Sequence, residues 1–224
     1  MRRRYLRSLV ALCFVLSSVS AGAETELAEH RGKGRVGSAK SQPDMRNIRH
    51  GRSIPDEGYC DQPYVVINEH GEWVCLLTTG PSHEGAGGQH YVSTVSGDHG
   101  KTWTPLVALE PSGGPEASYG VPLITPYGRI YAFYTFNGDR IKTLPGQDKR
   151  IRTDTLGWYC YRYSDDGGYS WSSKRYRLPM RVTACDRTNN WDGNVQIFWG
   201  IDKPMIHDRV ATFETGVQYH MYHA

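Results

Sequence analysis

One eight-residue pattern, Ser-x-Asp-x-Gly-x-x-Trp, occurs twice: as Ser96-Gly97-Asp98-His99-Gly100-Lys101-Thr102-Trp103 and as Ser164-Asp165-Asp166-Gly167-Gly168-Tyr169-Ser170-Trp171. The two copies begin 68 positions apart, and each directly follows a run rich in aromatic and β-branched residues, at 91–96 and 158–164. A repeat whose surroundings also repeat indicates a fold built from repeated supersecondary units.

The residues upstream of each copy form a second repeated feature. An apolar run at 64–67 turns at Gly71 into a run at 73–78, and a run at 121–124 turns at Gly128 into a run at 130–136. Short runs of this kind, separated by turn residues, are typical of antiparallel sheets, and no stretch has a convincing helical pattern. Each unit should therefore have about four strands, the size of a β-propeller blade. The second unit has the longer loop, at about 137–155.

The first 23 residues have the form of an export signal, with a basic start, an apolar run and small residues at the end. The apolar run is too short to cross a bilayer, so no membrane span is expected. Residues 24–50 are polar and are predicted to be a disordered leader before a propeller region at 51–224. Loss of the signal's four arginines lowers the formal charge from +3 to −1, which argues against a nucleic-acid partner. The mature protein is predicted to be secreted or periplasmic.

The cysteines leave the disulfide pattern open. Besides Cys13 in the signal, the chain has Cys60, Cys75, Cys160 and Cys185. An even number suits disulfides in an oxidising compartment, and one or two bridges or buried free thiols are all compatible with it. No Cys-x-x-Cys spacing occurs, and residues 165–167 lack the rest of a calcium-loop pattern, so no metal site is predicted.

The repeated pattern resembles the Asp box, or BNR repeat, of the bacterial sialidase (neuraminidase) superfamily. The resemblance implies an all-β, six-bladed β-propeller and a structural role for the box residues: Ser96, Asp98, Gly100, Trp103, Ser164, Asp166, Gly168 and Trp171. In such a turn the serine and aspartate bind backbone groups, glycine takes a positive φ, and tryptophan buries its ring. With two units visible and a third expected to begin near residues 195–200, the chain is predicted to hold about two to three blades.

By the same resemblance, the implied activity is that of a retaining exo-α-sialidase, a glycoside hydrolase that removes terminal sialic acid from extracellular glycans. Members of the family bind the sugar carboxylate with three arginines, and they use an aspartate as acid and base and a tyrosine–glutamate pair as nucleophile. Arg52 lies in Arg52-Ser53-Ile54-Pro55, which is similar to the family's Arg-Ile-Pro motif but has one inserted residue. Glu84, in the glycine-rich stretch 81–88, occupies the position of the acid/base. The nucleophile pair and the other arginines are expected in blades that this chain lacks, so the chain by itself is expected to be a truncated and nearly inactive fragment.

Further substrate-binding candidates lie where inner strands of the propeller would begin. They are Asp61, Gln62, Glu116, Asp186, Arg187 and Trp191. A tryptophan can stack on a sugar and an arginine can pair with its carboxylate, although each of these residues is also an ordinary turn residue. Glu84 likewise reads as an exposed loop carboxylate. His220 and His223 have metal-like spacing but lie in the terminal tail, so no metal and no cofactor are predicted.

The predicted partners are sialylated or other glycans, and the oligomeric state stays open. Two other functions fit the same residues. One is that of a non-catalytic, carbohydrate-binding Asp-box propeller, and the other is that of another exo-glycosidase that shares the Asp box. The fold and the site are separate arguments, so the box by itself does not choose among these functions.

Overall fold

The computed structural model describes residues 43–44, 46–197, 200, 203–207, 210–212 and 221–222. The predicted export signal, most of the predicted leader, Cys13, His220 and His223 lie outside these residues. The chain divides into Met1–Pro43 and Asp44–Ala224, and the elements described below belong to the second part. Near its start is a short 3-10 helix, η1 (Ile48–His50), where the Asn47 side chain accepts a hydrogen bond from the Arg49 N–H.

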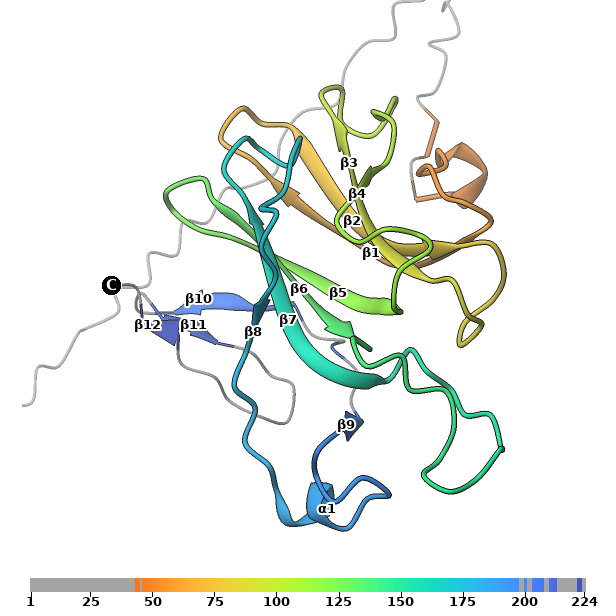
Figure 1. Ribbon diagram of the computed structural model, residues 1–224. Helices are drawn as coiled ribbons and strands as arrows, with labels where there is room; N and C mark the ends of the chain where they lie inside the picture. Colours follow the sequence, from red (N-terminus) through yellow and green to blue (C-terminus); the bar gives the residue numbers. More distant parts are fainter. Residues whose placement is uncertain are drawn as a thin grey trace, which may run out of the picture. The chain divides into compact units, whose positions relative to one another are not determined.

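Two antiparallel sheets, each built on a four-stranded meander, form most of the fold (Figure 1). The first consists of β1 (Tyr59–Ile67), β2 (Trp73–Gly80), β3 (His90–Ser96) and β4 (Val107–Ala108), in that order. The second repeats the order with β5 (Ala117–Ile124), β6 (Ile130–Phe136), β7 (Leu156–Ser164) and β8 (Tyr176–Arg177). Each sheet is a meander in which neighbours in the chain are neighbours in space. The prediction of an all-β, partial-propeller chain with four strands per unit is confirmed.

The remaining elements follow the second sheet. One helical turn, α1 (Ala184–Arg187), precedes β9 (Gln196–Ile197), and a separate three-stranded sheet contains β10 (Met205–His207), β11 (Val210–Thr212) and β12 (Met221–Tyr222). The stretch near 195–200, predicted to begin a third unit, instead supplies β9, which pairs with β7 at Leu156 and Gly157. Because β8 pairs only with Cys160 and Tyr161, it leaves that end of the β7 edge open for β9.

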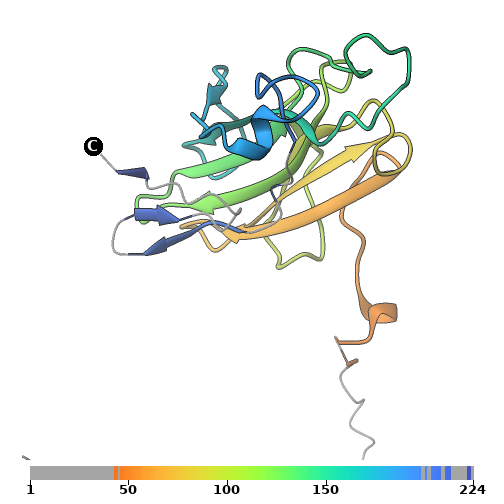
Figure 2. The same cartoon turned by 90° about the horizontal axis from the view of Figure 1, so that it is seen from below.

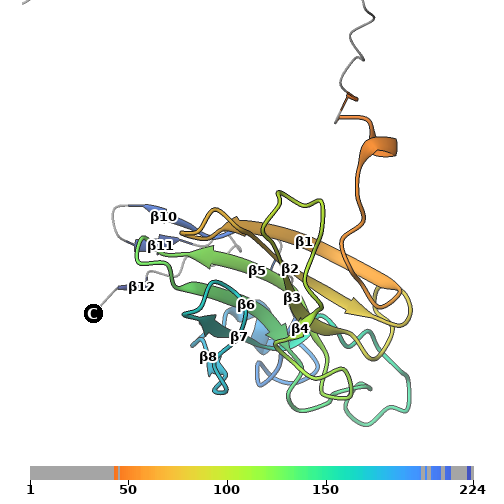
Figure 3. The ribbon, with the colours of Figure 1, turned by 90° about the horizontal axis from the view of Figure 1, so that it is seen from above.

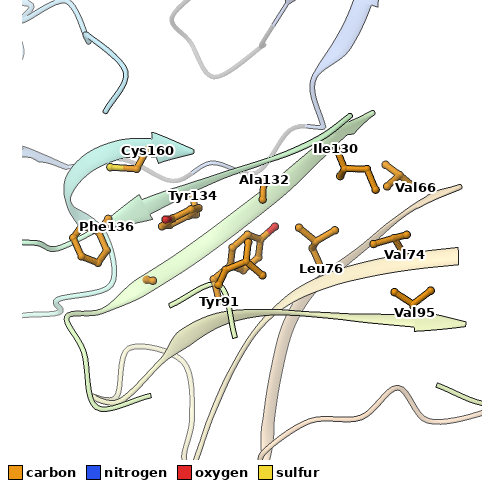
Figure 4. Close-up of a cluster of buried hydrophobic side chains, with 12 residues drawn as sticks. Val66, Val74, Leu76, Tyr91, Val95, Ile130, Ala132, Tyr134, Phe136 and Cys160 are labelled. Carbon is orange, nitrogen blue, oxygen red and sulfur yellow. The ribbon is translucent and has the colours of Figure 1, made fainter. Parts of the chain in front are cut away.

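The main core lies between the two sheets, which Figures 2 and 3 show as neighbouring layers. Val74, Leu76 and Tyr91 of the first sheet pack against Ala132 and Tyr134 of the second, as Figure 4 shows, and all five are fully buried. The contact is close at one point: a Cβ on Gly120 would lie 1.8 Å from the Tyr91 ring. Only glycine fits there, and Tyr91 can therefore lie flat against the second sheet.

The two sheets are related by a repeat rather than by face-to-face pairing. Tyr91 and Tyr159 lie the same number of positions before the two tryptophan patterns, so they are matching residues of the two units. Leu76 and Phe133 match in the same way, since they lie equally far after the turn glycines of their hairpins. Leu76 and Tyr91 face the second sheet, whereas Phe133 and Tyr159 lie in a separate core cluster with Leu123. Each sheet thus presents the same positions in the same direction, which is how successive propeller blades stack.

The two repeated stretches, the first box (96–103) and the second box (164–171), share most of their internal bonds, and the first box has a further one from the Lys101 N–H to Asp98. Ser96 Oγ donates to Asp98 Oδ1 at 2.9 Å and accepts from the Gly100 N–H at 2.8 Å, while Asp98 Oδ1 accepts from the Thr102 N–H at 2.8 Å. In the second box, Ser164 Oγ donates to Asp166 Oδ1 at 2.7 Å and accepts from the Gly168 N–H at 2.8 Å. Asp166 Oδ1 accepts from the Ser170 N–H at 2.9 Å. Both aspartates are thereby committed to their own turn.

The sequence left open whether the cysteines form disulfides or stay free thiols. The cysteines at 60, 75, 160 and 185 are all free thiols, and burial raises the pKa of Cys75 and of Cys160 to about 12. Within the part of the chain that the structure describes, no helix is long and apolar enough to cross a membrane.

Candidate functional site

A cavity of about 580 Å³, the first pocket, opens between the β2–β3 loop and the β6–β7 loop. Both loops lie at the right-hand end of the sheets in Figure 1. The cavity is lined by His83, Glu84, Gly85, Ala86, Gly87, Glu116, Lys142, Arg150, Ile151, Arg152 and Thr153. The lining thus combines two carboxylates with three basic side chains, and such polar groups in a concave site are typical of ligand binding.

The β2–β3 loop owes its shape to glycines and to a glutamate of the next unit. Gly85 and Gly88 have φ values of +78° and +93°, which other residues rarely adopt. The Glu116 carboxylate accepts hydrogen bonds from the Gly88 N–H at 3.1 Å and from the Gln89 N–H at 3.0 Å. Glu116 therefore anchors the loop of the first unit to the start of the second.

Two residues that line the pocket, Glu84 and Arg152, belong to a network of four side chains from three segments. Arg152 Nε and Nη2 donate to the two carboxylate oxygens of Asp154, at 2.7 and 2.9 Å. The Tyr119 hydroxyl donates to Asp154 at 2.7 Å and lies 3.1 Å from Glu84 Oε1. Arg152 Nη2 also contacts both Glu84 and Tyr119. The Asp154 side chain is completely buried, whereas those of Glu84 and Arg152 are 53% and 40% exposed. The network therefore has a fixed inner end and an outer end open to ligand.

Tyr119 reaches this network because the backbone bends at its position. The β5–β6 register shifts between Ser118 and Val121, and Tyr119 has a φ of +54°. The first unit has the same feature at the matching place, where the register shifts after Asp61 and Gln62 has a φ of +47°. Bulges and strained residues of this kind redirect side chains and occur often beside functional sites.

The pKa values of the carboxyl groups around the pocket are shifted in opposite directions. Hydrogen bonds from Arg152 and Tyr119 lower the pKa of Glu84. Burial raises the pKa of Glu116, and although its two backbone N–H donors oppose the effect, the Asp154 charge adds to it. Burial and the Glu84 charge raise the pKa of Asp61. A carboxylate held ionised beside carboxyls that retain their protons to higher pH is the arrangement that acid–base catalysis requires.

The structure brings several predicted residues to this site. Glu84 and Glu116 line the pocket, and Asp61 feels the charge of Glu84. The Gln62 side chain oxygen is buried and has no hydrogen-bond partner among the residues described. Arg52 is exposed in the segment before β1 and is not among the residues lining the pocket, so its role in carboxylate binding stays a prediction.

The other three candidates lie after the second sheet. Asp186 caps α1, because its carboxylate accepts hydrogen bonds from the Thr183 N–H and Oγ1, both at 2.7 Å. These bonds lower the pKa of Asp186 and give it a local structural task. Arg187 is exposed. Trp191 is half-buried and lines a different cavity, against residues 140–148.

Sequence reasoning missed three members of the network: Tyr119, Arg152 and Asp154. Two of them belong to the long loop of the second unit, and that extra length was the available signal. Tyr119 gave no signal, since its position depends on a bulge that the strand pattern does not reveal. In the described ranges no three His, Cys, Asp or Glu side chains are grouped so that they could hold a metal ion.

Comparison with known proteins adds information on the fold. No protein-family model and no curated protein sequence matches the chain. Among solved structures, a protein of unknown function from Dyadobacter fermentans is 16% identical, with a TM-score of 0.52 over 74% of this chain and 50% of its own length. A Hadza microbial sialidase is 18% identical, with a TM-score of 0.40 over 51% of this chain and 25% of its own.

A third solved structure is the α-L-arabinanase of Penicillium chrysogenum complexed with arabinobiose. It is 16% identical, with a TM-score of 0.39 over 77% of this chain and 48% of its own. The chain thus spans between a quarter and a half of the length of these proteins. At such identities the likeness concerns the fold alone.

Proposed function

We propose that this chain carries a sugar-binding and catalytic portion of an exported exo-glycosidase of the sialidase type, acting on terminal acidic sugars. The observation that supports this most directly is the first pocket, which is lined by Glu84, Arg152 and Glu116. The buried Tyr119 and Asp154 side chains bond to Glu84 and Arg152 and complete the network. The resemblance of the two boxes to Asp boxes supplies the choice of enzyme family. The activity belongs to the proposal, as does export.

The basic side chains of the pocket are suited to a sugar carboxylate. Lys142 and Arg150 line the cavity beside Arg152 and are exposed. Glu84 is half exposed and is held by Arg152 and Tyr119, so an incoming carboxylate can replace it on the guanidinium. Because guanidinium and carboxylate groups form paired, charge-assisted hydrogen bonds, this exchange keeps Arg152 neutralised.

The acid–base groups then have distinct tasks. Burial raises the pKa of Glu116, so this carboxyl is the proposed donor of a proton to the departing glycosidic oxygen. In place of the nucleophile pair expected in further blades, we propose the Tyr119 hydroxyl, which is already bonded to Asp154, as the nucleophile. It attacks the anomeric carbon while its proton passes to the Asp154 carboxylate, and water later releases the sugar. A neutral phenol suits a substrate whose own carboxylate lies next to the reacting carbon.

Hydrolysis of two sialosides by the full chain tests the proposal. One substrate carries a good aryl leaving group and the other a sugar leaving group. Tyr119→Phe should lower turnover of both at least a hundredfold, whereas Glu116→Gln should spare the aryl sialoside, which needs little protonation. Glu69→Gln, an exposed carboxylate at the β1–β2 turn, serves as the control and should change neither rate.

Two results would count against the enzyme. Binding of sialosides without hydrolysis favours the non-catalytic carbohydrate-binding function. Hydrolysis that survives both substitutions moves the active site away from the first pocket.

A further inference from the structure

A second cavity, of about 550 Å³, lies beside the first pocket and is lined by the β6–β7 loop and Trp191. Its residues are Arg140, Ile141, Lys142, Thr143, Leu144, Pro145, Gly146, Gln147, Asp148 and Trp191. Lys142 belongs to both cavities. The β6–β7 loop thus contributes residues to both cavities.

Local hydrogen bonds fix the loop that lines both cavities. Thr143 and Arg150 form an antiparallel bridge, and the Ile151 N–H donates to the Lys142 carbonyl at 3.1 Å. At its base, Asn137 accepts from the Ile141 N–H at 3.0 Å and donates to the Ile141 carbonyl at 2.9 Å. The loop is therefore a small hairpin with its own bonds, and the wall that it gives to each cavity has a defined shape.

Trp191 is held just as locally on the opposite side. The backbone N–H of Trp191 donates to the Asn189 side chain at 2.8 Å, and its backbone carbonyl accepts from the Asn194 N–H at 2.9 Å. The Asn189 side chain also donates to the Val195 carbonyl at 2.8 Å. These bonds fix the backbone of the turn and leave the half-buried indole facing the cavity that it lines. The turn follows α1, at the end of the second sheet where the β6–β7 loop also lies (Figures 1 and 2).

The chemistry of the second cavity matches a sugar ring. An indole offers a flat apolar surface to the C–H face of a pyranose. Hydrogen-bonding side chains for the ring's hydroxyl edge come from the loop, namely Arg140, Thr143, Gln147 and Asp148. A glycan whose terminal sugar lies in the first pocket would pass Lys142 to reach the second cavity, because this residue lines both.

We propose that the second cavity is a subsite for the sugar units that follow the terminal residue of a bound glycan, with Trp191 as its stacking platform. This inference rests on the proposed function in taking a terminal acidic sugar as the occupant of the first pocket. It adds that recognition extends beyond that sugar, so that ligand length should determine affinity.

Nuclear magnetic resonance titration of the full chain tests the subsite with two probes, the methyl α-glycoside of N-acetylneuraminic acid and 3′-sialyllactose. The trisaccharide should bind about tenfold more tightly, as expected for one aromatic stacking contact. Only the trisaccharide should shift the indole N–H signal of Trp191. In Trp191→Ala, affinity for the trisaccharide should fall to that for the monosaccharide, whose own affinity stays unchanged, and Trp191→Phe should restore most of the difference.

Tyr127→Ala is the matched control, because Tyr127 is an aromatic residue that is 86% exposed. It lies on the β5–β6 turn, at the opposite end of β6 from the β6–β7 loop. It should alter neither affinity. Equal binding of the two probes, or an equal loss for both in Trp191→Ala, overturns the subsite. Trp191-dependent binding of the trisaccharide without detectable binding of the monosaccharide supports the subsite but contradicts a terminal-sugar pocket. Binding of neither probe overturns both proposals.

Discussion

The two sheets share a frame, yet matching residues in them have different partners. In the second box, Trp171 Nε1 donates to Ser93 Oγ of the first sheet at 2.8 Å. In the first box, Trp103 Nε1 is just as inaccessible to solvent, but it has no hydrogen-bond partner among the residues described. The reason is position, because Trp171 faces the neighbouring sheet and Trp103 lies on the far face, with Cys75 and Leu77.

The inner strands show the same contrast. Gln62 and Tyr119 occupy matching places in their bulges, and both have a positive φ. The Gln62 oxygen is buried without a partner, whereas the Tyr119 hydroxyl joins the Arg152 and Asp154 network. The repeat therefore sets the backbone frame, and residues outside the repeat decide what each position does. Substitutions at matching positions can separate these two contributions.

The largest effect is expected at Glu110, which links the two units. Its fully buried carboxylate accepts from Arg175 Nε at 2.7 Å, Arg162 Nε at 3.1 Å and the Tyr134 hydroxyl at 2.5 Å. The matching residue of the second unit is Pro179, because the preceding residues, Leu109 and Leu178, make the same backbone bond to β3 and β7. Glu110→Ala leaves two arginines without their carboxylate and should cost about 3–5 kcal/mol of unfolding free energy.

Urea unfolding of Glu110→Ala and Pro179→Ala measures this difference. Pro179 is exposed, so its substitution should change stability by less than about 1 kcal/mol. Similar losses in the two variants would show that Glu110 is no special link between the units.

A smaller effect is expected for the box tryptophans. Trp171→Phe removes the donor to Ser93, whereas Trp103→Phe removes an N–H that has no partner in the described structure. Because the two rings shrink equally, Trp171→Phe should be the more destabilising by about 1–2 kcal/mol. Adding Ser93→Ala to each variant completes a double-mutant cycle, and coupling should appear with position 171 only. Coupling of the same size at both positions would contradict the assigned orientation of the sheets.

The sequence was sufficient for the repeated frame and insufficient for the site. Turn glycines, strand runs and the tryptophan pattern depend on neighbours within a few positions, so the four-strand units could be predicted from them. The Tyr119–Asp154 bond joins residues 35 positions apart, and the Trp171–Ser93 bond joins residues 78 apart. Such contacts depend on how the sheets stack. Glu84 was found because the resemblance places the acid/base in the loop before the first box, and Glu116 because it precedes an inner strand. Arg152 lies in a loop whose path no local pattern specifies.

The smallest effect is a loss of stability at low pH, and it tests whether the two boxes are equivalent. Hydrogen bonds from the Thr102 N–H and Oγ1 lower the pKa of Asp98 to about 2. In the second box, burial opposes the shift, but hydrogen bonds from Ser170 outweigh it and the pKa of Asp166 is also lowered. An unfolded aspartate titrates near pH 3.9, so each box should stabilise the fold fully above about pH 4 and lose this contribution as the pH falls toward 2.

Thermal unfolding of Asp98→Asn and Asp166→Asn between pH 6 and pH 2 follows this loss. Asparagine keeps an acceptor oxygen but removes the charge, so each variant should melt below the wild type at pH 6, and the gap should close as the wild-type aspartate is protonated. Each gap should close below about pH 4, because hydrogen bonds within the turn lower the pKa of both carboxylates. A gap that persists at pH 2 in one box alone would mean that contacts between the sheets, and not the turn itself, set the strength of that box.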